Sequence, residues 1–352
     1  MILRLRKFCA PGISYLEALL RLARHRLLRR QPPAVFLHSL FRSGSTYLFN
    51  AFRNETGFWC YYEPLHHQLI EIRQDRLAIF PFDKKTTDKM SHPHLSKPHF
   101  YEFKAVLKND HIPFFNIHMS YSEFAAVRQH ARLYKYVMTL LVSAPDKMIP
   151  LLQFNRSSLR IGWFKRFFRN ALHVYILRNH RDQFESYFRQ GEKYNIFLAI
   201  NLYIIAANCK RWKFDQAYSS YKNKIQITSD LFYDLKRLAF LSAELDRAVH
   251  YRVFLHLWVT SLVEAKRHAD IILDMNRLSE SPVYNQQVVQ LLRGKFALSP
   301  SIFSGCHIKR YDKYCMEDVA FTEIEREVCE TYRDELDALR IGNLAEIQTG
   351  FE

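Results

Sequence analysis

Residues 34–53 of the 352-residue chain have the sequence AVFLHSLFRSGSTYLFNAFR, and this stretch decides the fold. Its first part, residues 34–38, is a short apolar run after two prolines, which predicts a buried strand. A polar loop follows over residues 39–45, and residues 46–53 have a helical pattern. The stretch therefore predicts a strand, a polar loop and a helix in direct succession.

Three more apolar segments have the composition of strands, namely residues 148–154, 173–178 and 270–275. Helical patterns occur over residues 157–169, 181–190, 195–218, 236–268 and 322–340. Because strands alternate with helices, we expect an α/β fold with a mostly parallel central sheet flanked by helices, and with helical insertions. Residues 34–352 are expected to form a single domain, with a polar surface loop or insertion over residues 75–99.

Composition excludes some classes of protein. Hydrophobic residues make up 48% of the chain and glycines number only 9, which excludes global disorder and collagen-like repeats. The net charge of +16 favours polyanionic partners, which include nucleic acid, anionic lipid, acidic glycans and phosphorylated cofactors. The scattered cysteines indicate neither a zinc site nor a disulfide framework, and they suit a reducing compartment.

The N-terminal segment, residues 1–33, reads as a basic amphipathic helix followed by a linker. Residues 13–30 have two interpretations, a peripheral membrane contact or a helix packed on the domain with a solvated basic face. This segment lacks the features of a signal peptide, and the uncharged run over residues 194–209 is too short for a membrane span. We therefore expect a cytoplasmic protein, with or without a peripheral membrane contact.

The loop between the first strand and its helix has the chemistry of an anion site. A helix N-terminus offers unpaired N–H groups and a partial positive charge, and Gly44 lets the backbone turn closely around a ligand. Arg42 adds a full charge, and the neighbouring hydroxyl groups add donors. The loop lacks the pattern of a nucleotide-triphosphate loop. The alternative is an ordinary helix start capped by Ser or Thr.

A second anion site is indicated where the strand of residues 173–178 ends. Arg178 ends the strand and Ser186 follows in the next helix, so the pair is placed to bind another phosphate group. Ligands bind at the carboxyl ends of strands in such sheets. The alternative is a helix cap made by Asn179 and Asp182. Glu63, in the segment YYEPLHH, is a candidate general base, and its alternative role is a solvated loop charge.

These segments resemble the 3′-phosphoadenosine-5′-phosphosulfate (PAPS)-dependent sulfotransferases, and most closely the carbohydrate sulfotransferases with an RSGS loop. That family has a strand, an RSG[ST][ST] loop and a YEP segment in this order, as FLHSLFRSGSTYL and YYEPLHH occur here. It also has a strand that ends in Arg with a Ser eight residues later, as in HVYILRNHRDQFESYF. The sequence departs from the family at Asn179-His180, where Asp-Pro is usual.

The resemblance implies a P-loop-like fold, PAPS as cofactor, adenosine 3′,5′-bisphosphate as product, no metal, and a carbohydrate or glycolipid acceptor. It implies that the 5′-phosphosulfate is held by Arg42, Ser43, Gly44, Ser45 and Thr46, with Tyr47 beside them. Arg178 and Ser186 would hold the 3′-phosphate, and Glu63 would take the proton from the acceptor hydroxyl. The catalytic His of small-molecule sulfotransferases has no counterpart, so His66 and His67 are the alternative bases.

Other hypotheses stay open at this point. A phosphotransferase on a related sheet would need a Lys in the loop, which is absent, and a nucleic-acid-binding protein would need a binding module, which is not recognisable. A fold that has lost catalysis is a further alternative. Arg156 and Arg160 either approach the cofactor or lie on a solvated helix face. Lys309 and Arg310 are candidates to close over the nucleotide, whereas His92, His94 and His99 do not define a metal site.

Overall fold

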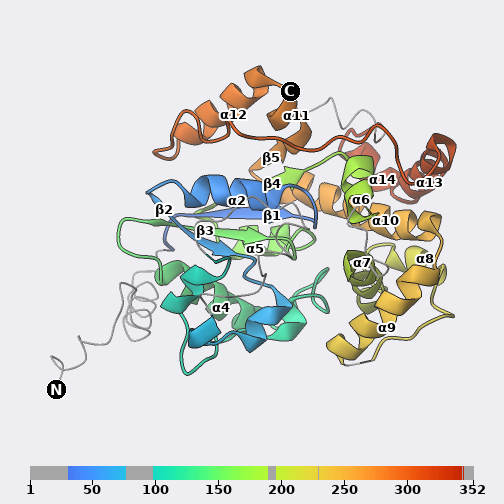
Figure 1. Cartoon of the computed structure of the whole chain (residues 1–352), viewed down its shortest axis with the longest axis horizontal. Coiled ribbons are helices and arrows are strands. Elements are labelled where there is room, and N and C mark those ends of the chain that lie inside the picture. The colour runs from blue at the N-terminus through green and yellow to red at the C-terminus, as the bar shows by residue number, and fades with distance from the viewer. Residues whose placement is uncertain (1–30, 77–97, 189–195, 229, 343, 345–352) are drawn as a thin grey trace.

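The computed structural model describes residues 31–76, 98–188, 196–228, 230–342 and 344. The five strands of its central sheet are β1 (Ala34–Ser39), β2 (Phe58–Tyr62), β3 (Ile149–Phe154), β4 (Ala171–Leu177) and β5 (Ile271–Asp274). They lie in the order β2-β3-β1-β4-β5 and every pair is parallel. The α/β class and the parallel sheet flanked by helices are confirmed (Figure 1).

The sequence prediction missed β2. Its segment FWCYY follows directly after the turn that ends α2, and it pairs with β3 along its whole length. The strand forms because its aromatic and Cys side chains are mostly buried, and it lies at the edge of the sheet, where it pairs with β3. An apolar run of this composition was a strand signal that went unused.

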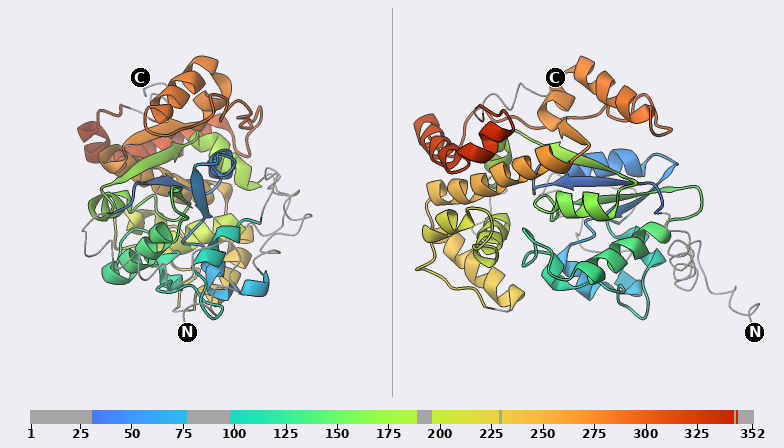
Figure 2. Two further views of the ribbon diagram at one scale, coloured as in Figure 1. Left: turned by 90° about the vertical axis from the view of Figure 1, so that its left-hand side faces the viewer. Right: turned by 180° about the vertical axis from the view of Figure 1, so that it is seen from behind.

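The helices begin and end as follows: α2 (Ser45–Arg53), α4 (His130–Val142), α5 (Ile161–Phe167), α6 (His180–Phe188), α7 (Ile196–Ala207), α8 (Phe214–Ser219), α9 (Leu231–Glu244), α10 (Arg247–His268), α11 (Met275–Glu280), α12 (Pro282–Arg293), α13 (Asp318–Thr331) and α14 (Arg333–Ala338). In Figure 1, α2, α11 and α12 lie on one side of the sheet, and α4 and α5 lie on the other. Helices α6 to α9, α13 and α14 gather beyond one end of the strands (Figure 2). Helix α10 runs back from them along the sheet, where Ser261 bonds Tyr175 of β4, and it leads into β5.

Some expected helices are each broken into two. The segment expected as one helix over residues 195–218 divides into α7 and α8, because the Asn208 side chain bonds the Ile204 and Tyr121 carbonyls and Trp212 takes a positive φ of 51°. The pattern over residues 236–268 divides at Asp246, whose carboxylate accepts from the Ala248 N–H and so starts α10. None of the helices in the described ranges combines the length and apolar character that crossing a bilayer needs.

The domain holds two apolar cores that meet at the sheet. One surrounds the strands together with α2, α4 and α12. The other lies among α6, α7, α9, α10 and α13 and reaches the sheet at Tyr175 and Leu177 of β4. The second core positions α6 against the loop after β1, since Gln183 donates to the Phe41 carbonyl at 2.7 Å. The helices therefore hold one side of that loop in place.

A chain of hydrogen bonds crosses the sheet core between β1 and β4. His173 Nε2 donates to the Phe168 carbonyl at 3.1 Å, and His173 Nδ1 accepts from His38 Nε2, also at 3.1 Å. His38 Nδ1 in turn accepts from the Ser157 hydroxyl at 2.7 Å. Burial lowers the pKa of both rings, that of His173 to about 4. Both histidines are therefore neutral at neutral pH, and each carries its proton on Nε2.

We expect this pair to make the protein less stable in acid. Unfolded His173 has its ordinary pKa of 6.5, whereas the folded value is about 4. The unfolded chain therefore binds more protons, and the stability present above pH 6.5 is lost as the pH falls toward 4, by roughly 3 kcal/mol at most. Urea unfolding of the wild type and of His173→Gln between these pH values measures it. Equal pH slopes for the two proteins would contradict the assignment.

Candidate functional site

The predicted site residues meet at the carboxyl edge of the sheet. The loop with Arg42 follows β1, Glu63 follows β2, and Arg178 follows β4. Asn155 and Arg156, which follow β3, lie between them. Because all the strands are parallel, each of these residues leaves the sheet at the same edge, where Figure 1 shows α6 beside the end of β1.

The loop after β1 is shaped to surround a small ligand with main chain. Arg42 and Gly44 both have positive φ angles, 65° and 91°. Gly44 is the N-cap residue of α2 and has no side chain with which to cap the helix. The Ser43 hydroxyl is buried and finds no hydrogen-bond partner within the described parts of the chain. Open helix N–H groups beside an unsatisfied buried hydroxyl fit an anion.

The hydroxyl groups further along the loop have protein partners. The Ser45 hydroxyl donates to Asn155 Oδ1 at 2.9 Å, and the Thr46 hydroxyl lies 3.2 Å from the Tyr62 hydroxyl. Tyr47 is partly buried, which raises the pKa of its hydroxyl. The start of α2 is thus held by Asn155 through Ser45, and its first main-chain N–H groups are left for the loop. The expectation of a simple Ser/Thr cap does not describe it, because the N-cap residue is Gly44.

Arg178 joins the second predicted anion site to the first. Its guanidinium donates to the Arg42 carbonyl at 2.9 Å and to the Lys309 carbonyl at 2.8 Å. Burial lowers the pKa of Arg178. The predicted helix cap is also present, because the Asn179 side chain accepts from the Asp182 N–H at 3.0 Å. The two segments that the sequence singled out are therefore in direct contact.

Ser186 is buried in α6 and uses its hydroxyl within that helix. It donates to the Gln183 carbonyl at 2.7 Å, one turn earlier. The contact to a 3′-phosphate that the resemblance implies would require this hydroxyl to leave the helix carbonyl. Its role as an anion ligand stays a prediction.

Glu63 is not a solvated loop residue, because it is only 4% exposed. One carboxylate oxygen accepts from the Asn155 amide, and the other forms an ion pair with Arg156. Burial raises the pKa of Glu63, and the Arg156 charge and the Asn155 hydrogen bonds oppose that rise. Glu63 also has a positive φ of 44°, so the turn after β2 is held in an uncommon conformation.

Asn155 was not predicted, although it links more of the site than any other residue described so far. Its Oδ1 accepts from Ser39 at 2.5 Å, from Ser45 at 2.9 Å and from Gln153 at 2.9 Å. Its amide nitrogen donates to Glu63, so one side chain ties the start of α2 to the carboxylate. The signal was a polar residue at the end of a predicted strand, the position that also singled out Arg178.

Arg156 and Arg160 are both 2% exposed, which excludes the alternative that they lie on a solvated helix face. Arg156 also donates to the Tyr121 hydroxyl at 2.8 Å, and its guanidinium lies over the Phe41 ring. Arg160 donates to the Met119 carbonyl at 2.9 Å. Arg156 is therefore the cation that compensates Glu63, a role that the sequence did not reveal.

The alternative bases, His66 and His67, both have their Nδ1 in use. His66 Nδ1 accepts from the Gln68 N–H at 3.2 Å. His67 Nδ1 accepts from the Tyr121 hydroxyl at 2.9 Å, because that hydroxyl already accepts from Arg156. Burial lowers the pKa of both, that of His67 to about 3. Each neutral ring therefore carries its proton on Nε2 and offers a hydrogen-bond donor there.

Residues 307–311, which we call the C-terminal strap, lie over the loop after β1. A methyl group added to Gly44 would lie 2.9 Å from the Ile308 side chain. Arg310 bonds Asp182 at 3.1 Å and also pairs with Glu280. A small cavity of about 40 Å³ at the ends of β4 and β5 is lined by residues that include Arg178 and Arg310. Closure of the strap over a nucleotide stays a prediction.

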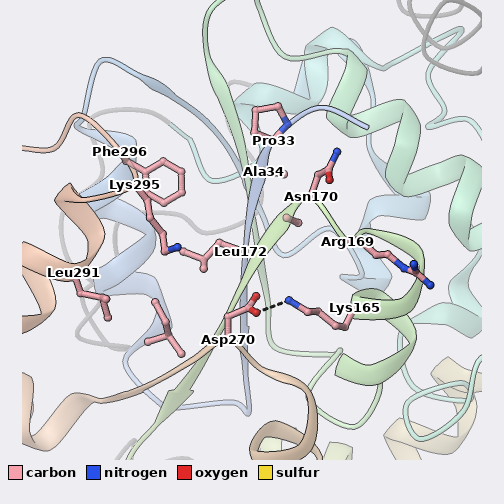
Figure 3. Close-up of a pocket in the computed structure, with 12 residues that line it drawn as sticks. Pro33, Ala34, Lys165, Arg169, Asn170, Leu172, Asp270, Leu291, Lys295 and Phe296 are labelled. Carbon is pink, nitrogen blue, oxygen red and sulfur yellow. Dashed lines mark hydrogen bonds and ion pairs between the residues drawn. The ribbon is translucent and has the colours of Figure 1, made fainter. Parts of the chain in front are cut away.

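A much larger cleft, of about 570 Å³, lies at the opposite edge of the sheet. It is lined by the first residues of β1, β4 and β5 and by the ends of α5 and α12 (Figure 3). It therefore shares no strand end with the candidate site.

Some predicted features lie outside the described residues, namely the amphipathic helix of residues 13–30, most of the polar loop of residues 75–99, and His92 and His94. His99 is buried with its ring 4.6 Å from that of Tyr62. Within the described ranges, no group of His, Cys, Asp and Glu side chains has the arrangement of a metal site.

Comparison with known proteins gives little. No protein-family model matches the chain, and no curated protein matches it. Among solved structures, the chain is similar to the sulfotransferase STF9 from Mycobacterium avium, with 14% sequence identity and a TM-score of 0.39 over 90% of this chain and 81% of that one. At this identity and score the likeness assigns neither an activity nor a substrate.

We expect Gly44→Ala to destabilise the protein. The left-handed φ costs an Ala about 1–2 kcal/mol, and the new methyl group meets Ile308 at 2.9 Å and Met275 at 3.1 Å. Gly57→Ala is the matched control, because no atom lies within 4 Å of its added methyl group. It should change the free energy of unfolding by less than about 0.5 kcal/mol. Equal losses in thermal unfolding for the two variants would show that the loop is not tightly held.

Proposed function

We propose that the protein transfers a sulfuryl group from PAPS to a hydroxyl group of a carbohydrate or glycolipid acceptor. One observation carries the proposal. Arg178 donates to the Arg42 carbonyl, so the segments that resemble the 5′-phosphosulfate loop and the 3′-phosphate site of sulfotransferases are neighbours. Glu63 is linked to the same loop through Asn155. A donor with phosphate groups on the 3′ and 5′ positions of one ribose suits two such neighbouring sites.

The residues present fit the donor's phosphosulfate end. The positive-φ loop, the open start of α2 and the buried, unsatisfied Ser43 hydroxyl all favour an anion at this position. Arg42 and the loop N–H groups would bind it, and Arg178 would bind the 3′-phosphate with Ser186. The strap residues Lys309 and Arg310 lie next to Arg178 and would complete that end.

When bound, PAPS supplies the sulfuryl group and a phosphate leaving group. The protein supplies position and charge, because Arg42 and the loop N–H groups meet negative charge that spreads over the transferred group. Glu63 takes the proton from the acceptor hydroxyl on a carboxylate oxygen. Each of its oxygens has a second lone pair beyond the bond to Asn155 or Arg156, and burial raises its pKa in the direction that favours proton uptake.

A sugar acceptor is supported by the rings that lie beyond Glu63. His66 and His67 stack with their centroids 4.6 Å apart, and Phe100 meets His66 edge to face at 5.7 Å. Phe232 on α9 meets His67 at 6.0 Å and is 47% exposed, so this group of rings reaches the surface. Apolar faces beside Nε2 donors suit a sugar ring with its hydroxyl groups. A membrane contact through residues 13–30 would suit a lipid-linked sugar.

The alternatives are a nucleotide-dependent phosphotransferase and a basic nucleic-acid-binding protein. We expect adenosine 3′,5′-bisphosphate to bind at about micromolar concentrations, with ATP and duplex DNA binding far more weakly. Titration calorimetry at two salt concentrations measures this. Preference for ATP would favour the phosphotransferase, and salt-sensitive DNA binding without bisphosphate binding would favour the nucleic-acid protein. Either result would overturn the proposal.

The pH dependence of sulfate transfer in Arg156 variants tests the role of Glu63 as general base. Arg156 lowers the pKa of Glu63, so Arg156→Gln should raise that pKa further and move the acid limb of the rate profile to higher pH. Arg156→Lys keeps the charge and should move the limb less.

Glu63→Gln should lower the rate by about 10²–10⁴ with bisphosphate binding kept. A labelled-donor screen over glycans gives the rates, and full activity of Glu63→Gln would exclude it as the base.

A further inference from the structure

The cleft at the amino edge of the sheet has the dimensions of a ligand site. Its volume of about 570 Å³ lies within the range of small-molecule pockets, roughly 300–1,000 Å³. Apolar side chains form much of its lining, among them Leu172 and Ile271 on the strands and Leu291 and Phe296 on the α12 side. In Figure 3, Leu291 and Phe296 lie on the same side of the strands as Lys295, which is drawn beside Leu172.

The charge of this cleft is unbalanced. Its lining includes Lys165, Arg169 and Lys295, and Asp270 is the one acid among the described residues that line it. Asp270 is occupied, because its carboxylate pairs with Lys165 and also accepts from the His173 N–H at 2.9 Å. Arg169 and Lys295 have no ion-pair partner within the described ranges. The cleft therefore carries two uncompensated positive charges.

The apolar and the positively charged side chains of the cleft lie next to each other. Lys295 extends from the end of α12 toward the strand edge, and Lys165 reaches Asp270 from α5 on the opposite side (Figure 3). Arg169 lies where the chain passes from α5 into β4, and its guanidinium is directed away from Lys295 (Figure 3). Leu291 is 50% exposed and lies on the same wall as Lys295, so an apolar surface open to solvent adjoins the charges.

We propose that this cleft binds an amphiphilic anion, a phosphate or sulfate group on an acyl or prenyl tail. The anionic group would bind Lys295, and the tail would cover Leu291 and Phe296, while Arg169 on the other side of the strands would add to the positive potential of the cleft. The site is at the other edge of the sheet from the loop after β1, so the proposal does not depend on sulfuryl transfer. The same chemistry occurs in soluble alkyl phosphates and in lipid headgroups.

The test is calorimetry of the full chain with dodecyl phosphate below its micellar concentration. We expect saturable binding that the double variant Arg169→Glu/Lys295→Glu weakens by at least about tenfold. The matched control is Lys222→Glu/Lys224→Glu, an equal charge change on exposed lysines outside the cleft, which should bind as the wild type does. Leu291→Ser, at a half-exposed position, should weaken dodecyl phosphate without affecting the fold.

Several outcomes would overturn the proposal: undiminished binding to the charge-reversed variant, equal binding of dodecyltrimethylammonium, or binding of inorganic phosphate as tight as that of dodecyl phosphate. Thermal unfolding of each variant shows that it is folded. Sedimentation with phosphatidic-acid vesicles then distinguishes a lipid headgroup from a soluble alkyl phosphate as the ligand. Loss of vesicle binding in Arg169→Glu/Lys295→Glu assigns a lipid headgroup, and unchanged vesicle binding with lost dodecyl phosphate binding assigns a soluble ligand.

Discussion

The buried ion pair between Glu63 and Arg156 is the constraint on which the site depends. A charge removed from water costs several kcal/mol unless a partner and further hydrogen bonds compensate it. Here Asn155 and Tyr121 supply those bonds, and each belongs to a different part of the chain. The ends of β2 and β3 and the segment around Tyr121 must therefore come together for either charge to be buried.

The loop after β1 takes its position from the same arrangement. Asn155 holds Ser39 below the loop and Ser45 at the start of α2, so the turn between them is fixed at both ends. Arg178 holds the middle of the loop through the Arg42 carbonyl. With its ends and centre fixed, the loop keeps Arg42 and Gly44 in left-handed conformations.

Much of the fold could be predicted from sequence because it depends on local pattern. Residues 34–38 and 173–178 are apolar runs of strand composition, and both form parallel strands. The break between α7 and α8 could not be predicted, because Asn208 ends α7 by bonding Tyr121, which is distant in sequence. In the site, the contact of Arg178 with the loop followed from strand ends that share one edge. The partners of Glu63 could not be predicted in this way. They depend on the order of the strands in the sheet, and β2, which precedes Glu63, was not predicted.

Arg178 uses its guanidinium to hold two main-chain carbonyls, one in the loop after β1 and one at Lys309 in the strap. An anion that takes over these donors must replace bonds that now fasten the strap to the sheet. Release of the strap from Arg178 and binding of an anion at the sheet edge are thus coupled. Thermodynamic reciprocity then requires that whatever loosens the strap alters anion affinity, and that an anion alters the strap by the same free energy.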